Sequence, residues 1–461
     1  MSRIWAVARH TIAESIRTKT ALVFMAMMVA LLVILPFKFN GDGVTLQSRI
    51  QGVLDLAITG TSALLSIMTV FLACSCLANE IRLHQIYMIV TKPIPRWQFF
   101  LGKWLGISLL NFTLLILAGI TVWSFTWLYL RNLPTFEEDR MAVKYNVLTV
   151  RYGAKMEEPD FANQVEERFR KLREEGRLDN VNQSGQAELR SQIDADLRKS
   201  WRSLGPGEYK DFTFSNMLVD RSDEEGVLYM RFKPMSPSGA DGAEFQAAWQ
   251  AGDHNDKDTL GPVQTGSFRA ERFHEVPIPA WTVNNENVLH LRIQNTSQRE
   301  TILFEGADSF EVLFDIGTFH WNITRAFSIV WCRLAFLAVL GLLCSTFLSF
   351  PVACMGVFIV LFIASSTTFL GEAIEWFSPK PLEQGALAML KTAFMYTVQG
   401  ILWLIPDFGR YDPASTVVAG RVVPLKWVIE SVVVLVAIKG FLMGLLGTVI
   451  LTRRELAQVT V

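Results

Sequence analysis

Six long apolar runs constrain this 461-residue chain more than any other feature of its sequence. They cover residues 21–37, 56–76, 106–130, 326–348, 351–369 and 427–451. A run of roughly 18 or more apolar residues is long enough for a helix to cross the ~30 Å hydrocarbon core of a bilayer. With 51% hydrophobic residues, the chain is also too apolar for one ordinary soluble domain. We therefore predict a polytopic α-helical membrane protein with six spans.

The charges divide the chain into two parts of opposite sign. Residues 131–322 carry 23 Lys and Arg against 33 Asp and Glu, a net charge of −10, whereas the rest carries +9. Basic residues gather before the first run, between the second and third, and after the last. Six spans place these three groups on one side, and Lys and Arg are retained on the cytoplasmic side. We predict a multi-pass plasma or inner membrane protein with both termini cytoplasmic and residues 131–322 extracytoplasmic.

The spans and the acidic segment define three regions. Residues 1–130 hold an amphipathic N-terminal helix and spans one to three, with a cytoplasmic loop at 79–104. Residues 131–322 form the inserted domain, and residues 323–461 hold spans four to six. The N-terminal helix carries Ile4, Ile12 and Ile16 on one side, a pattern typical of helices that lie in the membrane interface.

Short alternating runs in the acidic segment predict a β-sandwich. They begin at residues 145, 210, 227, 245, 287, 300 and 310. In the fifth, Leu289, Leu291 and Ile293 are expected on one face. Residues 160–205 instead show two amphipathic helical patterns, which predict a helical hairpin carried by the sandwich. This segment contains no cysteine, so it has to fold without disulfides.

The stretch VPIPAWTVNNENVLHLRIQNTS in this segment resembles a strand pair of jelly-roll carbohydrate-binding modules. The resemblance implies a jelly-roll-like fold. It makes Trp249 and Trp281 candidates for stacking on a sugar ring, and burial in the core is the alternative.

The stretch NEIRLHQIYMIVTKPIPRWQFFLGKWLG, residues 79–106, joins the second and third apolar runs. Pro93 and Pro95 stop a helix within it, because proline removes a donor and restricts the residue before it. The apolar residues at 86–90 lie outside the predicted membrane spans, which do not need them. Exposed apolar residues on a loop indicate a binding partner. A plain loop whose basic residues only set the topology is the alternative.

The same stretch resembles the first cytoplasmic loop of type-2 ABC exporter permeases. In that family a glutamate precedes a short helix, a KP(I/V)xR turn and a GK pair; here these are Glu80, residues 92–96 and Gly102-Lys103. The amphipathic helix, the six spans and RREL at 453–456 agree with the same family. The resemblance covers about 270 residues and excludes 131–322, where the family usually has a short connection.

The resemblance implies that this loop is a coupling helix seated in a groove of a cytoplasmic ABC ATPase subunit. The contact residues it implies are Glu80, Gln85, Ile86, Tyr87, Ile89, Val90, Lys92, Pro93 and Arg96. ATP-driven closure of paired ATPases would then rock the spans between inward and outward states.

The chain has no phosphate-binding loop, because Gly102-Lys103 is followed by Trp104 and lacks the upstream glycine spacing. We therefore expect no enzyme activity and no cofactor in this chain; ATP and Mg are bound by the partner ATPase subunit. A second permease subunit, identical or different, and membrane lipids are the other expected partners, and nucleic acid is not. The six histidines are scattered, so no metal site is predicted.

Charged residues at membrane depth are candidate functional residues. Arg333 either lines a translocation path or reaches a lipid headgroup from the end of its helix. Glu372 and Glu375 are candidates for the same path, with a solvated turn as the alternative. Residues 371–426 are predicted as an outer re-entrant segment, with a seventh span at 385–405 as the alternative.

These observations predict the transmembrane subunit of an ABC transporter that exports an amphipathic or envelope-related substrate. One alternative is a permease-like subunit that transmits ATP-driven motion to its outer domain without translocating a substrate. Another is a membrane-anchored protein that binds or senses carbohydrate.

Overall fold

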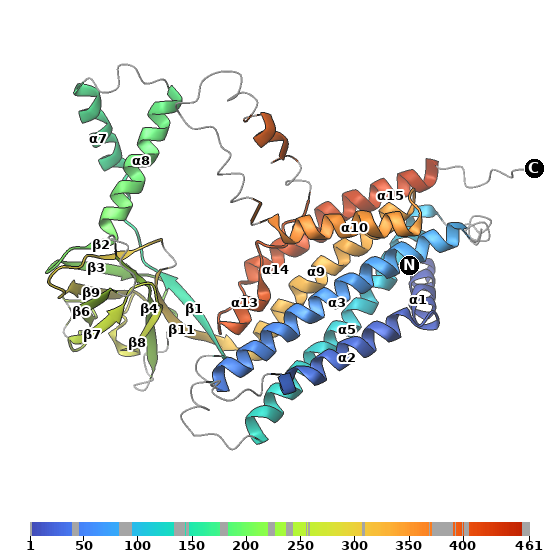
Figure 1. Cartoon of the computed structure of the whole chain (residues 1–461), viewed down its shortest axis with the longest axis horizontal. Helices are drawn as coiled ribbons and strands as arrows, with labels where there is room; N and C mark the ends of the chain where they lie inside the picture. The colour runs from blue at the N-terminus through green and yellow to red at the C-terminus, as the bar shows by residue number, and fades with distance from the viewer. Residues whose placement is uncertain are drawn as a thin grey trace, which may run out of the picture. The chain divides into compact units, whose positions relative to one another are not determined.

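The chain folds into two compact units, a helical unit and a β unit (Figure 1). The computed structural model describes residues 2–38, 46–82, 95–132, 143, 147–175, 183–219, 226–236, 243–254, 256, 259–306, 309–367, 369–370, 391, 393–398, 400 and 405–453. The β unit is formed by Arg151–Ile316, and the helical unit by the chain on either side of it. Most of the acidic segment therefore folds as a unit of its own.

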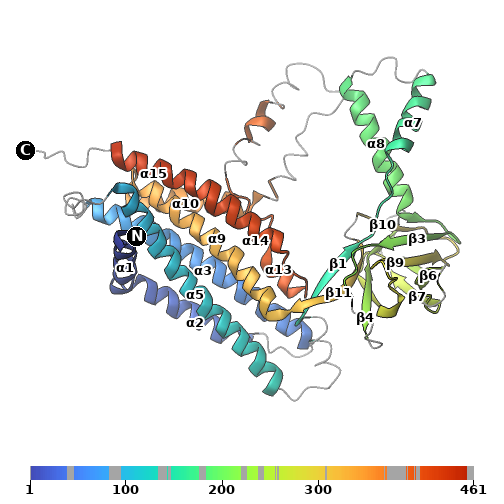
Figure 2. The ribbon, with the colours of Figure 1, turned by 180° about the vertical axis from the view of Figure 1, so that it is seen from behind.

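Four helices of the helical unit are long and apolar enough to cross a membrane. They are Ser48–Arg82, Arg96–Ser124, Phe319–Ser345 and Leu425–Arg453. The helices are α1 (Ser2–Arg17), α2 (Thr20–Lys38), α3 (Leu46–Arg82), α5 (Arg96–Asn132), α9 (Phe319–Ser345), α10 (Phe350–Ser365), α13 (Pro413–Val418), α14 (Leu425–Ser431), the π-helical η2 (Val432–Gly440) and α15 (Phe441–Arg453). Helices α2, α3, α5 and α9 run side by side in both views (Figures 1 and 2).

The described residues thus hold four span-length helices where six were predicted, or five if α1 and α2 form one bent span. These two helices meet at an angle of 66°, at an elbow where Lys19 has a φ of 61°. Helix α10 is apolar but has only 16 residues, because it ends at Ser365. At 1.5 Å per residue it is about 24 Å long, which is less than the hydrocarbon thickness.

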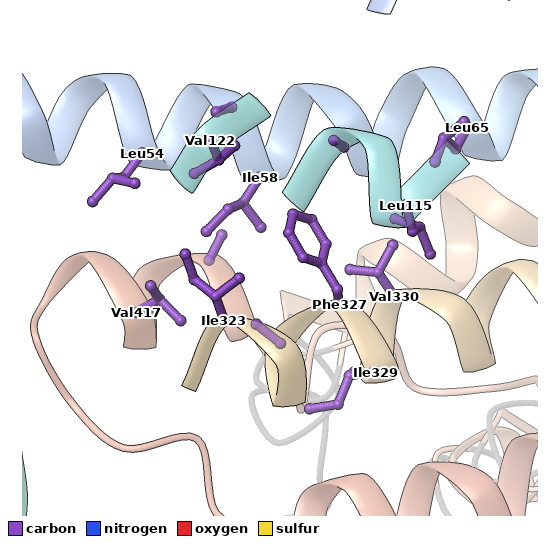
Figure 3. Packing of buried hydrophobic residues seen from close by; sticks show 14 of the residues in the cluster. Leu54, Ile58, Leu65, Leu115, Val122, Ile323, Phe327, Ile329, Val330 and Val417 are labelled. Atoms are coloured by element: carbon purple, nitrogen blue, oxygen red, sulfur yellow. The ribbon is translucent and has the colours of Figure 1, made fainter. Parts of the chain in front are cut away.

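Helix α9 is the centre of the helical unit. It packs against α3, α5, α10, α13, α14, η2 and α15. Within its most apolar stretch of 18 residues, 78% is buried. At Gly341 the backbone of α9 comes so close to α3 that an added Cβ would lie 2.6 Å from the Cβ of Ala73. Small residues allow such close packing between apolar helices. Buried apolar residues of these helices form a hydrophobic core. Figure 3 shows part of it: Leu54, Ile58 and Leu65 of α3, Leu115 and Val122 of α5, and Ile323, Phe327, Ile329 and Val330 of α9.

Antiparallel strands form three sheets in the β unit. The strands are β1 (Thr149–Lys155), β2 (Ser203–Leu204), β3 (Tyr209–Phe214), β4 (Val227–Phe232), β5 (Pro234–Met235), β6 (Glu244–Ala251), β7 (Gln264–Arg269), β8 (His274–Pro279), β9 (Leu289–Asn295), β10 (Ile302–Phe304) and β11 (Phe310–Thr318), and η1 (Ala280–Thr282) is a short 3₁₀ helix. The strand orders are β1-β11-β4-β8, β2-β10-β5 and β3-β9-β6-β7.

All three sheets contribute side chains to one hydrophobic core. Its centre is Phe310, which meets Phe212 edge to face at 5.1 Å and stacks on Phe304 at 4.8 Å. The alternation predicted in β9 is confirmed, because Leu289, Leu291 and Ile293 are all buried. Aromatic pairs at these distances contribute beyond their buried area, so a core without disulfides has a second source of stability.

Two helices precede β2 in the β unit and pack against each other: α7 (Ala162–Glu174) and α8 (Gln183–Trp201). They lie where the sequence predicts the helical hairpin, and one apolar cluster joins them. Its buried members are Phe161, Val165, Phe169, Ile193 and Leu197. Glu158, before α7, accepts hydrogen bonds from Arg198 and Arg202 at the end of α8, which closes the base of the hairpin.

Candidate functional site

A buried ion pair joins the end of α3 to the beginning of α5. Lys103 Nζ donates to Glu80 Oε1 at 2.7 Å, and the two residues are 1% and 4% exposed. The same ammonium group donates to Cys76, to its Sγ at 3.0 Å and to its carbonyl oxygen at 3.4 Å. All three lysine donors are therefore used. Because a buried charge without a partner is strongly destabilising, this pair fixes α3 and α5 to each other.

Arg96 makes a second connection at the beginning of α5. Its Nη1 donates to the carbonyl oxygens of Leu451 and Thr452 at 2.6 and 2.7 Å. These carbonyls belong to the last turn of α15, where backbone acceptors have no partner within the helix. A cation at a helix C-terminus also interacts favourably with the helix dipole. Arg96 thus connects the start of α5 to the end of the last span-length helix.

Glu80, Arg96 and Lys103, called here the loop-base site, lie on either side of residues 83–94. Glu80 stands before this segment, and Arg96 and Lys103 stand after it. Helix α5, which carries two of the three, is held further along by Asn111, whose Nδ2 donates to Thr69 Oγ1 of α3 at 2.9 Å. The segment therefore begins and ends on helices that are fixed within the bundle.

Helix α1 packs on the same end of α5 through two glycines. A Cβ added to Gly102 would lie 2.7 Å from the Cβ of Val7, and one added to Gly106 would lie 2.8 Å from the carbonyl oxygen of Ala8. Only glycine permits this approach without moving the α1 backbone. Glycine at these two positions therefore brings α1 into direct contact with the helix that carries Lys103.

The structure describes only two of the predicted ATPase-contact residues. Glu80 and Arg96 bind the bundle as described above, through Lys103 and the end of α15. The others lie outside the described residues: Gln85, Ile86, Tyr87, Ile89, Val90, Lys92 and Pro93. Their predicted contact with an ATPase subunit stays a prediction.

Arg333 lies on α9, beside a cavity of about 350 Å³. Its Nη2 donates to the carbonyl oxygen of Phe408 at 2.7 Å and also to that of Tyr411. The polar residues that line the cavity with it are Thr59, Ser62, Ser66, Ser365 and Asp412. Arg333 is half-buried among protein groups, an arrangement that differs from a side chain reaching out to lipid headgroups. Glu372 and Glu375 lie outside the described residues.

The two tryptophans proposed for sugar stacking have different environments. Trp249 is 7% exposed, packs on Phe268 at 5.6 Å and donates to Gln264 Oε1 at 3.1 Å. The structure therefore places Trp249 in the core, the alternative stated above, because a sugar ring stacks only on an accessible indole face. Trp281 is 36% exposed.

No local sequence pattern marks the pairing of Lys103 with Glu80. Both residues stand at the ends of apolar runs, where basic and acidic residues usually reach water. The Gly102-x-x-x-Gly106 spacing was a usable signal, since small residues four apart mark a helix-packing face. That signal identifies the packing face on α5 but does not identify α1 as its partner.

Comparisons of this chain with family models, with curated proteins and with solved structures find no match.

Proposed function

We propose that this chain is the membrane subunit of an ATP-driven transporter, and that residues 83–94 transmit movement from a separate ATPase subunit to α3 and α5. The observation that supports this proposal is the loop-base site. A loop can move a helix bundle only if both of its ends are attached firmly to that bundle. Before the loop, Glu80 is held by its ion pair with Lys103. After the loop, Arg96 is held by its hydrogen bonds to the end of α15.

Strong attachment matters because force on a loop is otherwise lost in local distortion. The Glu80–Lys103 pair is buried, so water does not compete for it and salt does not screen it as it does a surface pair. Packed helices with two discrete arrangements carry such movement as rigid bodies. In this proposal, a push on residues 83–94 moves α3 and α5 together with α1.

The finer parts of the proposal concern topology. We count α2 and α10 as spans in addition to the four long helices, which gives six and places both termini in the cytoplasm. The two four-stranded sheets are then the layers of an extracytoplasmic β-sandwich. The charge asymmetry of the sequence supports this orientation, because the basic ends of the spans fall on the cytoplasmic side.

An amphipathic substrate fits the cavity beside Arg333. The cavity is lined by hydroxyl groups, two charged side chains and apolar residues. Such a lining suits the polar head of a lipid-like molecule whose apolar part stays among the helices. We therefore propose an amphipathic, envelope-related substrate, with Arg333 near its polar group.

A photo-crosslinking amino acid at residue 86 tests the ATPase contact. The proposal predicts that in native membranes it captures a protein with a phosphate-binding loop. The matched control is the same amino acid at Leu218, an apolar residue of the β unit that is 73% exposed. Capture of the same ATPase from both positions, or from neither, would refute the contact.

A permease-like subunit that moves its β unit is the second candidate function. Strand β11 ends at Thr318 and α9 begins at Phe319, so the central helix and a sheet strand are consecutive in the chain. Inserting a flexible Gly-Ser linker between these two residues distinguishes the two functions. Substrate transport that the insertion leaves unchanged favours the transporter. Absence of transport in the chain without the insertion, with an ATP-dependent change in protease cleavage of the β unit that the insertion abolishes, favours transmission to the β unit.

A further inference from the structure

Three metal-ligating side chains meet beside the loop-base site. His10 and Glu14 lie one turn apart on α1, and Glu80 comes from α3. One ligand atom of each lies within 4.8 Å of the others, and His10 Nδ1 is 4.0 Å from Glu14 Oε2. Some metal-binding helical bundles hold an ion with ligands one turn apart on one helix and a carboxylate from a neighbouring helix. No local sequence pattern marks this group, because His10 and Glu80 are far apart in the chain.

Two carboxylate oxygens in this group are buried without a hydrogen-bond donor among the described residues. They are Oε2 of Glu14 and Oε2 of Glu80. The Lys103 ammonium is a partner only for the other oxygen of Glu80, Oε1, which it contacts at 2.7 Å. Buried acceptors without a partner are costly, so both oxygens point to a missing positive group.

The local charge also favours a cation. Glu14 and Glu80 carry two negative charges, and Lys103 carries one positive charge within the same group, which leaves a net charge of −1. The imidazole of His10 supplies a nitrogen ligand. Its side chain is 73% exposed, which gives an ion a path from solvent.

We propose that His10, Glu14 and Glu80 bind a divalent transition metal ion, with Zn²⁺ as the best match. Zn²⁺ accepts one imidazole nitrogen and carboxylate oxygens at about 2.0–2.2 Å, with ligand atoms about 3.4 Å apart in a tetrahedral site. The ligand atoms lie within 4.8 Å of one another, so binding requires the His10, Glu14 and Glu80 side chains to move closer together. Mg²⁺ is a poorer match, because it prefers oxygen ligands alone.

Bound metal would join α1 to α3. The glycine contacts hold α1 to α5, and the Glu80–Lys103 pair holds α5 to α3, so the ion adds the remaining connection among the three helices. Metal occupancy would then set how firmly α1 is held at the base of residues 83–94. This binding proposal stands on the ligand geometry and does not depend on the proposed transport function.

Calorimetric titration of the full chain, purified in detergent and treated with a chelator, tests the proposal. We expect one Zn²⁺ ion per chain, with affinity reduced about tenfold or more in His10→Ala and in Glu14→Gln. His254→Ala, which removes an exposed imidazole of the β unit, is the matched control and should leave the affinity unchanged. Both test positions are at least partly exposed, so these variants are expected to fold.

Cobalt absorption identifies the ligands. Co²⁺ at the proposed site should show the bands of nitrogen and oxygen ligands, altered in His10→Ala, with no thiolate charge-transfer band. Such a band would assign Cys76 as a ligand and overturn the proposed set. No Zn²⁺ binding below about 1 mM, equal affinity in wild type and both variants, or tighter binding of Mg²⁺ than of Zn²⁺ would also overturn the proposal.

Discussion

Lys103 is 1% exposed, and at the scale of single residues it shows what an apolar bundle supplies to keep a lysine buried. The ammonium group has a carboxylate, a carbonyl and a sulfur as acceptors, and the ring of Phe99 lies 5.2 Å away. Each acceptor replaces part of the lost hydration. Removal of one partner is therefore more harmful than removal of the whole pair.

We predict that Lys103→Met destabilises the chain by about 3–5 kcal/mol, because Glu80 is left charged and buried. The double variant Glu80→Leu with Lys103→Met should recover much of this loss. Unfolding of the full chain in detergent, followed by circular dichroism, measures both. Lys171→Met removes one partner of an exposed pair with Glu167 and serves as the control. An equal effect of Lys103→Met and Lys171→Met would contradict the prediction.

Glu158 provides a pH-dependent prediction in the β unit. Burial raises the pKa of this carboxyl, but hydrogen bonds from Arg202 and Arg198 outweigh burial and hold the pKa below its ordinary value of 4.5. Because the folded pKa is the lower one, the stabilisation is present above pH 4.5 and is lost as the pH falls through the folded pKa.

We therefore expect Glu158→Gln to lower the protection of α8 from hydrogen exchange at pH 7 by about 1–2 kcal/mol. At pH 3 the difference from wild type should shrink, because this pH is below the ordinary pKa of 4.5 and the carboxyl is then largely protonated in the unfolded chain. Exchange of peptides from 183–201, corrected for the intrinsic rate at each pH, measures this. A difference that stays constant from pH 7 to pH 3 would exclude the ion-pair explanation.

At the scale of elements, α1 buries a strip of small residues beside the apolar side that its sequence indicates. Ala8, Thr11 and Ser15 are buried, whereas Trp5 and Ile16 are 55% and 46% exposed. The glycines of α5 explain the difference, because a close helix contact accepts only small side chains. Trp5 and Ile16 are left on the outer side, where a helix of the membrane interface contacts lipid.

Gly106→Val tests this contact, because a side chain at this position meets the α1 backbone. We predict that hydrogen exchange in residues 2–17 is at least tenfold faster. This corresponds to a loss of about 1.4 kcal/mol or more in the free energy of local opening. Gly356→Val on α10 is the matched control, since nothing lies within 4 Å of a Cβ added there. Unchanged exchange in Gly106→Val, or equal changes in both variants, would contradict the packing.

At the scale of the whole molecule, the chain separates an apolar helical unit from an acidic β unit. The division follows composition, because apolar runs are stable in a lipid environment and charged alternating strands are not. The cysteines follow it too: all five belong to the helical unit, and four of them are buried.

Cysteine labelling tests the orientation that we propose. A cysteine in place of Leu218, in the β unit, should react with an impermeant maleimide in intact cells, whereas one in place of Arg17 should react only after lysis. The native cysteines give little background, because four are buried and Cys344 is half-buried. Labelling of residue 17 in intact cells would refute the cytoplasmic N-terminus.

Patterns that depend on neighbouring residues were predictable from the sequence. Hydrophobic length predicted the long helices, and alternation predicted β9 with its buried Leu289 and Ile293. Alternation alone did not predict β8, because Pro277 and Pro279 argue against a strand, and only the resemblance to a strand pair indicated it. Strand β8 lies at the edge of its sheet, so the N–H groups that these prolines lack leave no further strand without a donor.

The sequence by itself determined which segments are apolar, which alternate and where charge changes sign, because these properties are set by residues a few positions apart. Only the tertiary structure decided that Lys103 pairs with Glu80, that Arg96 binds the end of α15 and that α1 lies on Gly102 and Gly106. Each of these contacts joins residues on different helices. Their partners depend on how closely whole helices approach, which is set by shape and burial across the bundle and not by any local pattern.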